Sequence, residues 1–93
     1  MDDTISRLRT ISRDCVLRNA AGYNWLVRVK QDGPRYIKPV RFNDTGAAIW
    51  RALTEGADEA MLSSLLTDGE EPMEETHRDL SDFLMQLCAA LGE

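Results

Sequence analysis

The sequence predicts one α+β domain, in which a three-stranded antiparallel sheet is followed by three helices. Its length of 93 residues fits a single domain. Residues 15–42 carry aromatic and β-branched residues in the alternating pattern of half-buried strands. From residue 43 onward the apolar residues recur at helical spacing instead. Strands and helices that are segregated along a chain in this way are typical of an α+β fold.

Residues 1–13 show no clear hydrophobic period, so we expect a flexible N-terminal arm ahead of a folded domain that spans residues 14–93. This stretch lacks the apolar run of a secretory signal peptide. The sequence also contains no apolar run of about 18 residues that could cross a membrane. These features favour a cytoplasmic protein, where a reducing environment argues against a disulfide between Cys15 and Cys88.

The expected strands cover residues 15–18, 23–30 and 35–42, with turn signals at 19–22 and 32–34. In the second strand the alternation places four side chains on one face: Tyr23, Trp25, Val27 and Val29. In the third strand Tyr36, Val40 and Phe42 share a face. One face of such a sheet packs on the rest of the domain while the other meets water. Trp25 is expected in the core, as is Trp50 of the first helix.

Three helices should follow the sheet. The first begins near Asn43 or Asp44, whose short polar side chains can accept the first free backbone N–H groups, and it ends at Gly56. The second begins at Asp58 and the third near Pro72. The third helix has the strongest periodic signal, carried by Leu80, Phe83, Leu84, Leu87, Cys88 and Leu91 at spacings i, i+3, i+4, i+7, i+8 and i+11.

The sequence offers no recognisable catalytic constellation. His77 is the only histidine and no catalytic motif surrounds it, so we expect a solvated or packing residue, with contact to a partner as the alternative. No phosphate-binding loop, nucleophile elbow or Cys-x-x-Cys motif is present. We therefore expect a binding protein rather than an enzyme, with neither a cofactor nor a metal site.

Charge is distributed unevenly along the chain. Residues 1–42 hold nine Lys or Arg against four Asp, whereas residues 43–93 hold two Arg against twelve acidic residues. Three of the cations, Arg35, Lys38 and Arg41, lie in the third strand. They could flank an extended peptide that adds itself to the edge of the sheet. Alternatively, they could only keep an exposed edge from aggregating. The residues alone leave both interpretations open.

A local signature begins at the end of the third strand and reads Phe42-Asn43-Asp44-Thr45-Gly46-Ala47-Ala48-Ile49-Trp50. Leu62 and Leu66 follow as apolar anchors of the second helix. The third helix carries Asp79-Leu80 and then Phe83-Leu84-Met85-Gln86-Leu87. Together these residues resemble the PqqD-like family, whose domains are also called RiPP recognition elements.

The resemblance implies a winged helix-turn-helix-like domain that binds the leader segment of a ribosomally made precursor peptide. The leader would lie as an added strand along the third strand, in a groove walled by the third helix. The domain would then deliver it to a modifying enzyme, such as a radical SAM enzyme, a cyclodehydratase or a leader protease. Carried over by position, the groove would use Arg35, Tyr36, Ile37, Lys38, Val40 and Arg41 of the strand with His77, Leu80, Ser81 and Leu84 of the helix. On this basis Lys38→Glu or Leu80→Asp should weaken peptide binding while the fold stays largely intact.

Two other functions compete with leader binding. A winged helix-turn-helix also suggests a DNA-binding regulator, but the third helix sets Arg78 alone against Glu74, Glu75, Asp79 and Asp82. Such a helix repels phosphate, so no nucleic-acid partner is expected. The second alternative is a structural subunit of a modification complex that does not touch the peptide. A homodimer also stays open, because an exposed strand edge can pair with a second copy.

Overall fold

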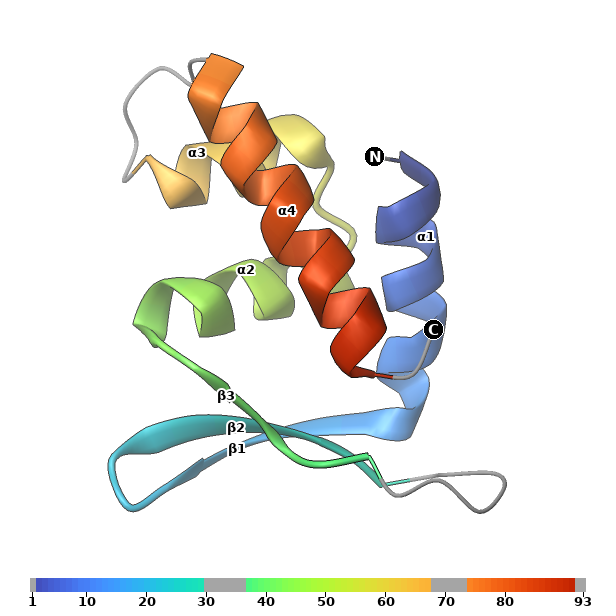
Figure 1. Ribbon diagram of the computed structural model, residues 1–93, viewed down its shortest axis with the longest axis vertical. Coiled ribbons are helices and arrows are strands. Elements are labelled where there is room, and N and C mark those ends of the chain that lie inside the picture. Colours follow the sequence, from blue (N-terminus) through green and yellow to red (C-terminus); the bar gives the residue numbers. More distant parts are fainter. Residues whose placement is uncertain (1, 30–36, 68–73, 92–93) are drawn as a thin grey trace.

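The computed structural model describes residues 2–29, 37–67 and 74–91 (Figure 1). Its elements are α1 (Asp2–Ile11), the short 3-10 turn η1 (Ser12–Asp14), β1 (Cys15–Ala20), β2 (Tyr23–Arg28), β3 (Val40–Phe42), α2 (Asp44–Thr54), α3 (Glu59–Leu66) and α4 (Glu74–Ala90). The strands form one antiparallel sheet in the order β1-β2-β3. The predicted α+β class is confirmed, and the sheet followed by α2, α3 and α4 is winged helix-turn-helix-like.

The expected flexible arm over residues 1–13 is wrong for the residues that the structure describes. Residues 2–14 form α1 and η1, and Ile5, Leu8 and Ile11 lie buried in the common core. Arg9 donates from Nε to the Leu53 carbonyl and from Nη2 to the Ala57 carbonyl, both at 2.9 Å. These acceptors lie at and just beyond the C-terminal end of α2, where helix carbonyls lack partners within the helix. The N-terminal helix is therefore part of the packed domain.

A two-residue turn, Ala21-Gly22, joins β1 to β2. Both turn residues have positive φ, 54° and 81°, as a type I′ hairpin turn requires. β3 pairs with β2 through Trp25↔Arg41 and the two flanking pairs, and it is shorter than the expected strand over residues 35–42. Pro39 immediately precedes it and has no backbone N–H to donate to a ladder. The expected turn at 32–34 lies outside the described residues.

The helices lie on one side of the sheet (Figure 1). On that side β2 carries Leu26, which is fully buried, and Asn24, which is 7% exposed. Asn24 tolerates burial because its amide donates to Asp44 Oδ1 at 3.1 Å and accepts from Asn19 Nδ2 at 3.3 Å. Trp25 therefore points to the opposite face and is only half-buried, so its expected place in the core is wrong. Trp50 does belong to the core, as predicted.

The helix starts follow the predicted capping residues. Asn43 accepts the Gly46 N–H at 2.7 Å at the start of α2, and Asp58 accepts the Met61 N–H at 2.9 Å at the start of α3. A Cβ at Gly46 would stand 3.2 Å from Asn43 Oδ1, so the absence of a side chain there gives the cap its room. Gly56 takes φ 102° just after α2, a conformation that favours glycine.

Candidate functional site

A groove of about 260 Å³ runs between β3 and α4. It is lined by Val40, Arg41 and Phe42 of the strand and by Phe83, Gln86, Leu87 and Ala90 of the helix. The four helix residues stand at i, i+3, i+4 and i+7, so they form one stripe along α4. Most of the lining is apolar, which makes the groove suited to hydrophobic side chains of a ligand.

Aromatic packing connects the floor of the groove to the core. The rings of Phe42 and Phe83 lie 5.9 Å apart at an angle of 51°, and Phe42 also lies 6.4 Å from the ring of Trp50. Phe42 is buried whereas Phe83 is only half-buried. Tilted ring pairs at these separations add to the burial energy of the rings. The floor of the groove is thus packed directly onto the core.

One wall of the groove is the edge strand of the sheet. β3 follows β2 at the end of the sheet order, so among the described strands it is paired on one side only. An edge of this kind can accept an extended chain as a further strand. At the other wall, Arg28 of β2 donates from Nη1 to the Leu91 carbonyl just beyond α4. This bond ties the C-terminal end of α4 to the sheet and helps to fix the width of the groove.

The predicted strand residues are placed unevenly around this groove. Val40 and Arg41 border it, but the Arg41 guanidinium lies 4.9 Å from the Tyr23 ring centroid on the far face of the sheet. Ile37 and Lys38 precede β3 outside any strand, the first half-buried and the second exposed. Arg35 and Tyr36 lie outside the described residues.

Two of the predicted helix residues, Leu80 and Leu84, are fully buried core side chains and do not line the groove. The expectation that Leu80→Asp leaves the fold largely intact is therefore wrong, because the new carboxylate would be buried. Ser81 is half-buried on α4, and its hydroxyl lies 3.8 Å from Met85 Sδ. It too is absent from the lining of the groove.

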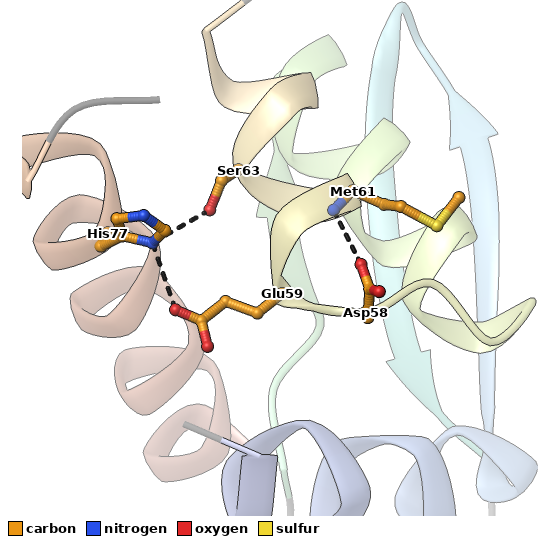
Figure 2. Close-up of polar contacts among 5 residues, drawn as sticks. All are labelled: Asp58, Glu59, Met61, Ser63 and His77. Carbon is orange, nitrogen blue, oxygen red and sulfur yellow. Dashed lines mark hydrogen bonds and ion pairs between the residues drawn. The ribbon is translucent and has the colours of Figure 1, made fainter. Parts of the chain in front are cut away.

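His77 faces α3 rather than β3 (Figure 2). Its Nδ1 lies 3.1 Å from Glu59 Oε1 and 3.4 Å from Ser63 Oγ. A serine–histidine–acid relay needs the hydroxyl and the carboxylate on different ring nitrogens, whereas both approach the same one here. Ser63 is also fully buried, so a substrate could not reach its hydroxyl. These three residues join α3 to α4 and do not form a catalytic triad.

The family model described as coenzyme PQQ synthesis protein D (PqqD) matches residues 27–90. The chain belongs to the PqqD family. The matched segment contains β3 and α4, and therefore both walls of the groove. Searches of curated proteins and of solved structures gave no match. Membership of the PqqD family suggests a peptide-binding partner protein in the biosynthesis of a cofactor or of a modified peptide.

Two further observations concern metal binding and thiol chemistry in the ranges that the structure describes. Within them, no group of three or more His, Cys, Asp or Glu side chains is placed to hold a metal ion. Burial raises the pKa of the Cys15 thiol; Arg28 opposes this shift and Asp14 adds to it. A protonated thiol is a weak nucleophile. None of the described helices is long and apolar enough to cross a membrane.

The groove shares β3 and α4 with the predicted site, but it is lined by a different set of α4 residues. Phe83 and Leu87 were part of the periodic signal, yet Gln86 and Ala90 were not singled out. Leu80, Leu84 and Leu91 face the core, and the groove stripe lies beside them on the same helix, with the buried Leu87 at the border between the two. Helical period shows which residues share a face, but the rotation of that face relative to a sheet depends on tertiary packing.

Proposed function

We propose that this PqqD-family chain captures the leader of a ribosomally made precursor peptide and presents it to a modifying enzyme without taking part in the chemistry. The leader would add as a strand to β3 and place apolar side chains in the groove beside α4. The observation that carries the proposal is the position of this apolar groove directly beside a strand edge, within the segment that the family model matches.

The groove offers the two kinds of contact that strand addition needs. The β3 edge supplies backbone groups that fix direction and register, while the half-buried side chains of Val40 and Phe83 provide an apolar surface beside the buried Leu87. A disordered leader loses conformational entropy when it becomes a strand, so its affinity should depend on a few apolar anchors. The exposed Gln86 adds an amide at the rim that can donate to or accept from the leader.

Charge would orient the leader in the groove. The N-terminal part of α4 carries four exposed carboxylates, those of Glu74, Glu75, Asp79 and Asp82. On the strand side the exposed cation Lys38 precedes β3, whereas the Arg41 guanidinium lies over the Tyr23 ring on the far face of the sheet. A leader with basic residues towards the start of α4 and acidic residues beside the strand would match both walls. The acidic helix also argues against DNA as the ligand, because phosphate is repelled from it.

The proposed partners are therefore the leader and one modifying enzyme, of the radical SAM, cyclodehydratase or leader protease class, in the cytoplasm. A structural subunit that never touches the peptide is the competing function. It predicts that changes confined to the groove have no effect on peptide affinity, which the following variant pair tests.

Ala90→Trp should weaken leader binding at least tenfold. Ala90 is exposed at the last residue of α4 and lines the groove, so an indole there would occupy the space that the leader needs. The measurement is a fluorescence anisotropy titration of the labelled leader of the neighbouring precursor gene. The matched control is Ala89→Trp, which places the same indole one residue earlier, at an exposed position outside the groove lining.

Equal loss of affinity in both variants would mean that the indole acts through general destabilisation and would not support the groove. Wild-type affinity in Ala90→Trp would contradict the proposed site. No binding by the wild-type protein, with the enzyme present, would favour the structural subunit. Urea unfolding of each variant, monitored by circular dichroism, shows whether the fold is retained.

A further inference from the structure

The side of the sheet that faces away from the helices carries a cluster of aromatic, aliphatic and basic side chains, here called the outer face. Cross-strand pairing places Val16 beside Val27, and Arg18 and Arg41 on either side of Trp25. Residues paired across neighbouring strands point to the same side of a sheet. Tyr23 belongs to the same face, two residues before Trp25. Figure 1 shows the helices gathered on the opposite side.

The outer face has the composition of a protein interface. Tyr23 is 49% exposed and packs edge-on against Trp25, with their ring centroids 6.4 Å apart. A shallow apolar hollow of about 370 Å³ lies beside them, lined by Arg18, Ala20, Trp25, Val27 and Pro39. Tyrosine, tryptophan and arginine are the residues most enriched at binding hot spots. A partly exposed apolar cluster of this kind is typical of an interaction site.

Charge determines what kind of surface can cover the outer face. Among the described strand residues its charged side chains are Arg18 and Arg41, and no carboxylate shares the face with them. The Arg41 guanidinium is held over the Tyr23 ring, which keeps the cation close to the apolar centre. A second copy stacked face to face about a two-fold axis would bring the same cations together. The face is therefore complementary to an acidic partner and not to itself.

We propose that the outer face docks a protein surface that presents carboxylates around a protruding apolar side chain. Resting on the proposed function, we identify this partner as the modifying enzyme that receives the leader. The outer face and the groove lie on opposite sides of β3: Arg41 reaches Tyr23 on one side, and Val40 and Phe42 line the groove on the other. An enzyme docked on the outer face leaves the groove open. A leader added to β3 then lies directly beside the docked enzyme.

The test uses the full chain and the modifying enzyme encoded beside it, titrated by isothermal calorimetry. Arg18→Glu and Tyr23→Ala change exposed residues of the outer face, and each should weaken enzyme binding at least tenfold. The matched control is Arg7→Glu, which makes the same charge change at an exposed position of α1 and should bind within twofold of wild type. Binding of the wild-type protein should also weaken as NaCl rises from about 50 to about 300 mM, since exposed charges are screened.

Leader titration of the same variants separates this inference from the proposed function. Loss of enzyme binding with unchanged leader binding is the expected result. Wild-type enzyme affinity in both Arg18→Glu and Tyr23→Ala overturns the inference while leaving leader capture intact. A wild-type protein that binds the enzyme through these residues but no leader refutes the proposed function alone. Sedimentation showing a wild-type homodimer that Tyr23→Ala dissociates would assign the outer face to a second copy and overturn the inference.

Discussion

Leu80→Asp is expected to unfold the domain rather than to impair peptide binding selectively. Leu80 is fully buried in the stripe of α4 that packs on the core. Removing a buried leucine side chain alone costs about 2–5 kcal/mol. An aspartate there would also have to bury an unpaired charge or take up a proton at a further cost of several kcal/mol. The sum is comparable with the whole stability of a small domain, about 5–15 kcal/mol.

The measurement is far-UV circular dichroism of Leu80→Asp, with urea unfolding of any folded fraction. Met85→Asp is the control, because it introduces the same charge on the same helix at a side chain that is 59% exposed. Its free energy of unfolding should stay within about 1 kcal/mol of wild type. A cooperative transition of Leu80→Asp near the wild-type midpoint would contradict the burial of Leu80. Loss of leader binding in Leu80→Asp would therefore report unfolding and would not locate the groove.

The local elements of the fold could be predicted because their signals are local. The caps Asn43 and Asp58 are recognisable by side-chain chemistry, and Gly56 ends its helix through a backbone conformation that glycine favours. The period of α4 likewise identified its buried leucines. In each case the residues that decide the structure lie within a few positions of one another.

The arrangement of the two sheet faces could not be predicted in the same way. Alternation placed Tyr23, Trp25 and Val27 together, but their greater hydrophobicity suggested the wrong face for burial. The buried face instead carries Asn24, whose polar groups are satisfied by Asn19 and by Asp44, twenty residues away. A polar residue becomes acceptable in a core only when such distant partners are in place. The same limit affects the groove, since the rotation of α4 over β3 depends on packing.

The N-terminal helix is the element that could not be predicted from the sequence. A substitution of one of its buried residues should have a large effect on the free energy of unfolding. Ile5, Leu8 and Ile11 recur every three residues, but Arg7 and Arg9 interrupt a segment too short to show a full period. Leu8→Ala should lower the free energy of unfolding by about 3 kcal/mol, because Leu8 is fully buried among core side chains.

Urea unfolding followed by tryptophan fluorescence measures this change, and Arg7→Ala serves as the control at an exposed position of the same helix. The control should shift the free energy by no more than about 0.5 kcal/mol. If residues 2–11 were a flexible arm, Leu8→Ala would behave like Arg7→Ala, because neither side chain would lose a packing partner. A large difference between the two variants instead requires α1 to unfold together with the sheet and the other helices. A truncated chain that begins at residue 14 should then have a lower free energy of unfolding than the full chain, even though it retains β3 and α4, which form the groove.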